Sequence, residues 1–315
     1  MSLLLAIVLL TTSFLFVLSA QNGLAATIAQ QHSMTGQMST VSNVFGSLPT
    51  IAALLIGGLL SEILESYNAD QAGRTLFIIG AAIMGMVTIY AVWKPASVFD
   101  NVKINGTRPL KQINRLIRHW PIYPALLIWL LWNFAPGSTT PLQYHMQNNL
   151  HATDTEWGQW NAIFAASFIP TFLLFGFLCQ RLPLKTLLLW GTIVAIPQMI
   201  PLLFIHSVNG ALLAAAPMGL MGGVATAAYL DLIIRSCPEG LQGTTLMMSS
   251  SLFVVISRVG DVLGTHLYDR YGDFSVCVIA ITLVYALILP TLLMVPRHLI
   301  AAADGQVLVP KDSDH

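Results

Sequence analysis

The chain has 315 residues, of which 55% are hydrophobic and 9% are charged, and its 14 basic and 14 acidic side chains leave no net charge. A soluble domain carries about 25% charged residues, so this composition excludes a wholly water-soluble protein and predicts that lipid covers much of the surface. The lack of a basic excess also argues against a nucleic-acid partner.

Nine stretches reach the length of about 20 mostly apolar residues that a membrane-spanning helix requires. They are residues 3–31, 37–61, 75–93, 122–144, 158–179, 184–206, 209–234, 243–267 and 274–295. The first could be a secretion signal, but no basic residue precedes it, so a spanning helix is the preferred interpretation. The sequence therefore predicts an all-α, polytopic membrane helix bundle of about nine transmembrane helices.

The charges of the loops predict how the chain is oriented. Six basic side chains and one acidic side chain lie between residues 94 and 120, whereas residues 62–74 hold three acids and one base. Basic loops remain on the cytoplasmic side of a membrane. We therefore expect residues 95–120 and the C-terminus to be cytoplasmic and residues 62–74 to be outside, most simply in the plasma (inner) membrane.

A weak internal repeat relates two helices that start 207 residues apart. Gly36 matches Gly243 and Gly57 matches Gly264 without a gap. Parallel repeats are typical of secondary transporters. The repeat predicts a twelve-helix plan without its first triplet, whether as a fragment or as a true nine-helix form. The expected domains are a three-helix remnant of the N-terminal bundle (1–94), a cytoplasmic basic linker (95–120), a six-helix C-terminal bundle (121–298) and a cytoplasmic tail (299–315).

Two glycine-containing segments resemble the major facilitator superfamily. Residues 57–62 are similar to the family's fifth helix, and residues 176–185 are similar to the loop between its eighth and ninth helices. The family usually has an aspartate where Gln180 stands, so a charge relay in this loop is in doubt. The resemblance implies a fold of this family that lacks the first three helices, and a secondary active transporter that works by alternating access.

Three shorter segments are similar to the folate-biopterin transporter branch of that family. They are residues 132–138, 148–150 and 237–240. This similarity implies a pteridine-like or folate-like solute, or another small organic solute, by analogy only.

Polar residues inside predicted spans are candidates for contact with the solute, because burying them in lipid is costly. The candidates are Gln21, Asn22, Asn133 and Gln143. Pro136 interrupts the fourth span, and a broken backbone at membrane depth survives only inside protein or beside a wet cavity. The alternatives are hydrogen bonds between helices for the amides and a simple packed kink for the proline.

Two pairs of opposite charge are candidates for coupling or gating. Arg258 and Asp261 are three residues apart within one span, and Asp231 and Arg235 are four residues apart near a cytoplasmic end. Such spacing places both members on one helix face. The alternative interpretation is structural, with the first pair holding its helix against neighbours and the second pair lying at the membrane interface.

The sequence contains no catalytic motif, and its three cysteines are too far apart for a metal or redox site. We therefore expect no enzyme activity, no metal and no cofactor. The expected partners are a small-molecule solute and membrane lipid, without an obligate protein partner. The alternative function is that of a non-transporting membrane protein, either a solute sensor or an inactive truncated transporter.

Overall fold

The structure is a computed structural model that describes residue 18 and residues 21–91, 114–238 and 240–305. Residues 21–31 are helical, and the principal helices follow as α2 (Thr35–Ala91), α5 (Ile122–Asn133), α6 (Thr140–Tyr144), α7 (Asp154–Leu178), α8 (Leu184–Ala195), α9 (Val208–Ser236), α10 (Gln242–Tyr271), α11 (Ser275–Ala286), α12 (Ile288–Leu292) and α13 (Arg297–Ile300). A π-helical turn, η1 (His145–Asn149), and a 3-10 helix, η2 (Ile196–Phe204), complete the described part, which has no strand. The predicted all-α fold is confirmed.

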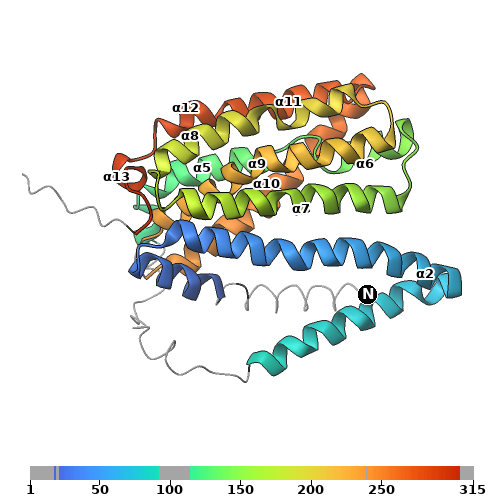
Figure 1. The fold of residues 1–315 in the computed structure, drawn as a ribbon, viewed down its shortest axis with the longest axis horizontal. Helices are drawn as coiled ribbons and strands as arrows, with labels where there is room; N and C mark the ends of the chain where they lie inside the picture. Colours follow the sequence, from blue (N-terminus) through green and yellow to red (C-terminus); the bar gives the residue numbers. More distant parts are fainter. Residues whose placement is uncertain (1–17, 19–20, 92–113, 239, 306–315) are drawn as a thin grey trace, which may run out of the picture.

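Six helical segments of the described residues are long and apolar enough to cross a membrane. They lie within α2, α7, α9 and α10, and in the combined segments of α8 with η2 and of α11 with α12. Most of the first predicted stretch and residues 95–113 of the basic linker lie outside the described residues. The helices run roughly parallel to one another, as a membrane bundle requires (Figure 1).

Helix α2 covers the second and third predicted spans without a break in helical backbone. A straight helix of this length would extend for roughly 85 Å, but Figure 1 shows that α2 turns back on itself at its far end. Residues 62–74 have helical backbone, so the two predicted spans are connected by a sharp reversal within α2 rather than by an extended loop (Figure 1).

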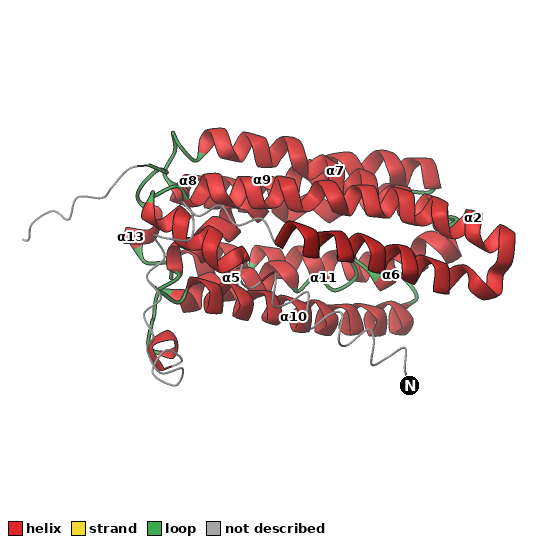
Figure 2. Ribbon diagram, turned by 90° about the horizontal axis from the view of Figure 1, so that it is seen from below, coloured by secondary structure: helices red, strands yellow, loops and turns green. Residues whose placement is uncertain are grey.

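The centre of the bundle is formed by α7 and α9, with α2 packed on their outer side. Glycines on α9 allow this approach, because a methyl group at Gly219 would collide with the carbonyl oxygen of Phe164 and one at Gly223 would collide with the Thr171 side chain. Small residues at such interfaces let helix backbones come close in a membrane. On the opposite side, α10 lies beside α5 and α6 (Figure 2).

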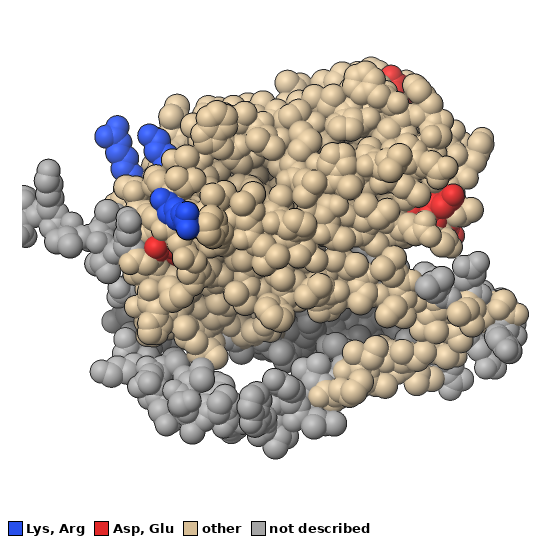
Figure 3. Space-filling model, in the orientation of Figure 1, with Lys and Arg blue, Asp and Glu red and all other residues tan. Residues whose placement is uncertain are grey.

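The charged side chains on the visible face gather at the ends of the bundle (Figure 3). Lys and Arg lie at the end where α13 is found, and most of the visible Asp and Glu lie at the other end. The surface between them carries large exposed apolar side chains, including Phe45, Leu173 and Trp190. This division of charge and apolar surface is what a bilayer crossing the middle of the bundle requires.

Candidate functional site

The fourth predicted span is interrupted in the structure, between Asn133 at the end of α5 and Thr140 at the start of α6. Pro136 and Gly137 lie in the interruption, and Gly137 has a φ of +110°, which favours glycine. A methyl group at Gly137 would also meet the Cβ atom of Cys277 on α11. The segment is therefore a packed break in the helix rather than a smooth bend.

The broken segment packs against two glycines of α10. A methyl group at Gly264 would collide with the amide nitrogen of Gly137 and lie 2.8 Å from the carbonyl carbon of Pro136. One at Gly260 would lie 3.2 Å from the amide nitrogen of Ala135. The backbone of residues 135–137 thus rests directly on α10, and this contact brings the polar residues that follow the break close to the charged residues of α10.

Asp261 on α10 holds the start of α6. Its carboxylate accepts hydrogen bonds from the Thr140 amide at 2.9 Å, from the Thr140 hydroxyl at 2.7 Å and from the Thr139 hydroxyl. A carboxylate at the first N–H groups of a helix satisfies donors that have no partner within the helix. Arg258 is farther away, with its Nη1 atom 4.0 Å from an Asp261 oxygen. The predicted pair therefore exists, but the hydrogen bonds to Asp261 come from the broken helix.

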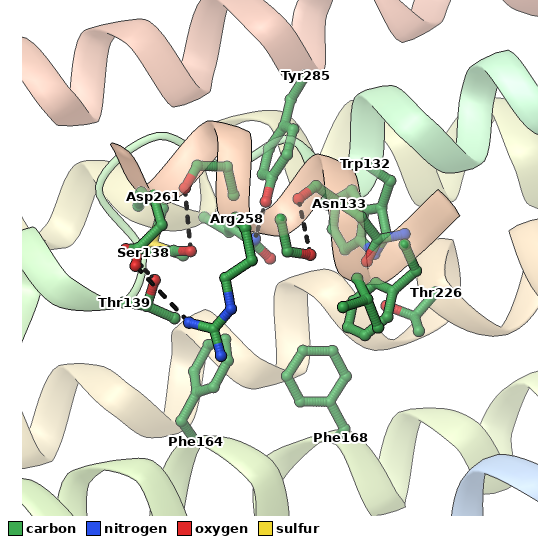
Figure 4. A pocket seen from close by; sticks show the side chains of 16 residues that line it. Trp132, Asn133, Ser138, Thr139, Phe164, Phe168, Thr226, Arg258, Asp261 and Tyr285 are labelled. Carbon is green, nitrogen blue, oxygen red and sulfur yellow. Dashed lines mark hydrogen bonds and ion pairs between the residues drawn. The ribbon is translucent and has the colours of Figure 1, made fainter. Parts of the chain in front are cut away.

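A cavity of about 480 Å³ lies beside the break. It is lined by residues of α5, α7, η2, α9, α10, α11 and the interrupted segment, so most of the bundle contributes to it. Asn133, Arg258 and Asp261 all line this cavity (Figure 4). The Asn133 side chain donates a hydrogen bond to the carbonyl oxygen of Trp129 at 2.8 Å. The volume falls within the range of small-molecule sites in proteins.

Aromatic rings form much of the cavity wall. Phe164 and Phe168 of α7 lie on one side, and Trp132 of α5 and Tyr285 of α11 lie on the other (Figure 4). Trp132 and Tyr285 are stacked, with ring centroids 4.6 Å apart and an interplanar angle of 27°. Paired walls of this kind suit a flat, partly apolar molecule.

Gln198 of η2 adds a buried polar group to this wall. It is 2% exposed, and its amide nitrogen lies 3.4 Å from the Tyr285 hydroxyl. Its amide oxygen has no hydrogen-bond partner among the described residues. This oxygen faces α9, because a methyl group at Gly222 would collide with it, so it is enclosed between helices and not presented to the cavity.

The other predicted solute contacts lie away from this cavity. Gln21 is exposed and Asn22 is half-buried, both in the helix formed by residues 21–31. Gln143 is half-buried on α6. None of the three lines the cavity beside the break, so their contact with a solute stays a prediction.

The aromatic walls and Gln198 were not predicted from the sequence. A signal for one wall was present, because Trp160, Phe164, Phe168 and Phe172 recur at intervals of four and therefore share one face of α7.

A second group of charges lies at the end of the bundle where α13 is found. Asp231 of α9 is fully buried and lies 2.9 Å from the Nε atom of Arg235. Arg235 also lies 3.5 Å from an oxygen of Asp304 and donates to the carbonyl oxygen of Ala302 at 2.9 Å. The Asp231 side chain is completely covered by its neighbours, because the segment after α13 folds over the end of α9. The position of this pair at the membrane interface stays a prediction.

Asp304 binds the first turn of α2. Its carboxylate accepts hydrogen bonds from the Gly36 amide at 3.2 Å and from the Gln37 amide at 2.9 Å. Its own amide donates to the carbonyl oxygen of Cys179 at 2.8 Å. Next to this contact, the Gln180 side chain donates a hydrogen bond within its own turn, to the carbonyl oxygen of Gly176. The carboxylate at the start of α2 thus comes from the segment after α13 and not from the loop that holds Gln180.

Cys179 lies beside this carboxylate, with its sulfur 3.9 Å from an Asp304 oxygen. Burial, followed by the negative charges of Asp304 and Asp231, raises the pKa of the Cys179 thiol to about 12. The thiol is therefore protonated and unreactive at neutral pH as long as the end of the bundle stays closed.

The described residues contain no group of His, Cys, Asp and Glu side chains that could hold a metal ion. A sequence profile of the Major Facilitator Superfamily matches residues 1–265. No curated protein matches the chain. The profile covers most of the sequence, and the helical bundle agrees with it. The chain therefore belongs to the major facilitator superfamily, a family of integral membrane proteins that act as secondary transporters of small solutes rather than as enzymes.

Proposed function

We propose that the protein moves a small organic solute across its membrane by alternating access, with the solute held in the cavity beside the broken helix. The observation that carries this proposal is the 480 Å³ cavity, which is lined by both aromatic and charged residues inside a bundle of membrane spans. Broken helices at the sites of transporters expose backbone groups to the solute. Arg258 carries a charge into this open space without a hydrogen-bond acceptor among the described residues, which is costly in a membrane span unless a solute pairs with it.

The proposed solute contains a flat heteroaromatic ring, as pteridines and folates do. Support comes from the stacked rings of Trp132 and Tyr285, which lie across the cavity from Phe164 and Phe168 (Figure 4). The resemblance of residues 132–138 to the folate-biopterin branch also favours a solute with such a ring.

We extend the proposal to proton coupling. Asp261 lies well inside the span Gln242–Tyr271, and Asp231 is fully buried near the end of the span Val208–Ser236. A carboxylate in such a place binds and releases protons as its surroundings change between conformations.

The test is uptake of radiolabelled pterin by proteoliposomes that contain the purified protein. We expect accumulation above equilibrium under an imposed proton gradient, and its loss when a proton uncoupler is added. Phe168→Leu should reduce uptake at least tenfold, because it removes a ring from the cavity wall. Phe177→Leu on the same helix is the matched control, since Phe177 is 53% exposed and lies outside the cavity.

Two results would contradict the proposal. Empty and protein-containing liposomes that take up the same amount of pterin would favour the non-transporting alternative. Equal losses in the Phe168 and Phe177 variants would show that the cavity is not the site.

The proposed orientation places the C-terminus in the cytoplasm and residues 62–74 outside, in the plasma (inner) membrane. The separation of Lys and Arg from Asp and Glu along the bundle supports it (Figure 3). A cysteine placed at Asn68 should react with an impermeant thiol reagent in intact cells, and one placed at Asn105 should not. The reverse pattern would overturn the orientation.

A further inference from the structure

Arg258 is a charged residue of a membrane span that has no strong partner. It lies on α10 within the span Gln242–Tyr271, and it lines the cavity. Its side chain is 80% exposed, whereas that of Asp261 is 14% exposed. The guanidinium group extends from α10 toward the rings of Phe164 and Phe168 (Figure 4). The cation is thus presented to the cavity and not buried against protein.

The carboxylate of Asp261 accepts no hydrogen bond from Arg258. The separation of 4.0 Å between Arg258 and Asp261 is too long for a hydrogen bond. Thr139 and Thr140 already donate three hydrogen bonds to Asp261. Among the described residues no acceptor takes a hydrogen bond from the guanidinium group, which has five N–H donors in a planar fork. Such a fork matches the geometry of a carboxylate.

The surroundings of Arg258 define the rest of the ligand. Four aromatic rings line the same cavity, two from α7, one from α5 and one from α11. A ligand that fits both features has an aromatic ring and an acidic group for the arginine. An uncharged ring would leave the guanidinium without an acceptor, whereas a carboxylate would accept hydrogen bonds from its planar fork.

We propose that Arg258 determines specificity by binding the carboxylate of a planar aromatic acid, so that the transported solute is an anion. This inference rests on the proposed function for its relevance to transport, but it can be tested by binding alone. The competing view is that Arg258 serves only to neutralise Asp261. The three hydrogen bonds from the broken helix make that role dispensable, since they stabilise the carboxylate without the arginine.

The test uses three probes with the full-length protein in lipid nanodiscs, measured by isothermal titration calorimetry at neutral pH. The probe 2-naphthoate carries a ring and a carboxylate, 2-naphthol carries the ring alone, and cyclohexanecarboxylate carries the charge without a flat ring. We expect 2-naphthoate to bind the wild-type protein at least tenfold more tightly than either of the others.

The variants separate charge from packing. Arg258→Gln should remove the preference for 2-naphthoate over 2-naphthol, and Arg258→Lys should retain part of it, because lysine keeps the charge but not the planar fork. The matched control is Arg270→Gln, which alters an exposed arginine at the end of the same helix, outside the cavity. Because no described residue accepts a hydrogen bond from Arg258, its variants should elute as the wild type does in gel filtration.

Three results would overturn the inference: equal affinity of the wild type for the two naphthalene probes, an unchanged preference in Arg258→Gln, or no saturable binding of any probe. Its failure is distinguishable from failure of the proposed function. Binding that depends on Arg258, without any pterin uptake by proteoliposomes, would leave the anion site in place and refute transport of pterins. Pterin uptake by proteoliposomes, together with equal binding of the acidic and the neutral probe, would support transport of pterins and refute the anion site.

Discussion

Replacing Asp304 with asparagine should loosen the contact between the segment after α13 and the start of α2. The carboxylate accepts backbone hydrogen bonds from Gly36 and Gln37 and lies 3.5 Å from Arg235. Asparagine keeps the shape of the side chain, but it carries no charge and one of its two terminal atoms is a donor. That atom would face a backbone N–H group or the arginine, both of which are donors themselves.

The expected cost follows from these contacts. A hydrogen bond to a charged group contributes about 1.5–3 kcal/mol, and Asp304→Asn removes about one of the two backbone bonds together with the attraction to Arg235. The ion pair is long and Arg235 keeps Asp231 as a second partner, so its loss adds little. A net loss of about 2 kcal/mol corresponds to a roughly 30-fold shift toward the open arrangement of this end.

The thiol of Cys179 reports this opening. It is 1% exposed and lies beside Asp304. In a background where Cys237 and Cys277 are alanine, N-ethylmaleimide should label Cys179 slowly in the wild type and tens of times faster in Asp304→Asn. Loss of the Asp304 charge also lowers the pKa of the thiol and adds to the rate. Labelling at several pH values separates the two effects, because only the pKa changes the shape of the pH profile.

The control is Asp273→Asn, which removes an exposed carboxylate from the loop between α10 and α11. It should leave the labelling rate unchanged. If Asp304→Asn labels Cys179 no faster than the wild type does, the carboxylate does not close this end of the bundle and the reasoning from its hydrogen bonds is wrong.

Three further predictions concern the cavity and its surroundings. Asp261→Asn should destabilise the protein by about 1–2 kcal/mol, and double-mutant cycles should show an interaction energy of Asp261 with Thr140 but little with Arg258. Unchanged proton-driven accumulation in this variant would show that Asp261 does not couple transport to protons. Gly264→Ala should lower the melting temperature because the methyl group meets the broken segment, whereas Gly57→Ala, with open space around it, should raise it slightly; similar shifts in both would contradict the packing. Burial lowers the pKa of His145 below its ordinary value, so the unfolded chain binds the proton first as the pH falls. The stability contributed by neutral His145 is therefore complete above about pH 6.5 and is lost as the pH falls through the folded pKa. His145→Gln should flatten the dependence of thermal stability on pH between pH 7.5 and pH 5.5, and an unaltered slope would refute this assignment.

The break in the fourth span could be predicted because its cause is local. Pro136 cannot donate its backbone nitrogen, and Gly137 allows a φ that other residues avoid, so the interruption follows from covalent geometry. The repeat was informative in the same way: α2 begins at Thr35 and α10 begins at Gln242, which are the positions that the 207-residue offset makes equivalent. Helical periodicity and composition gave the rest of the membrane bundle.

The partners of the charged residues could not be predicted because they come from distant parts of the chain. A spacing of three residues placed Arg258 beside Asp261, yet Thr140, which is 121 residues away, supplies the shorter contacts. In the same way, the sequence near Gln180 suggests that no acid lies at the end of the bundle, whereas Asp304, 125 residues after Cys179, places a carboxylate there. Periodicity identifies neighbours on one helix, but only the packing of different helices selects among their possible partners.

Asp261 and Asp304 make similar hydrogen bonds at different places in the bundle. This difference in place predicts different roles for the two residues in a transport cycle. Each carboxylate binds N–H groups at the start of another helix, α6 for Asp261 and α2 for Asp304. In the proposed alternating access, residues 121–298 would rotate as one body. The Asp261 contact stays within these residues and would remain intact, whereas the Asp304 contact joins the segment after α13 to α2 and would break. Substitutions at Asp304 should therefore change the rate at which the two halves separate, and those at Asp261 should act on the solute site itself.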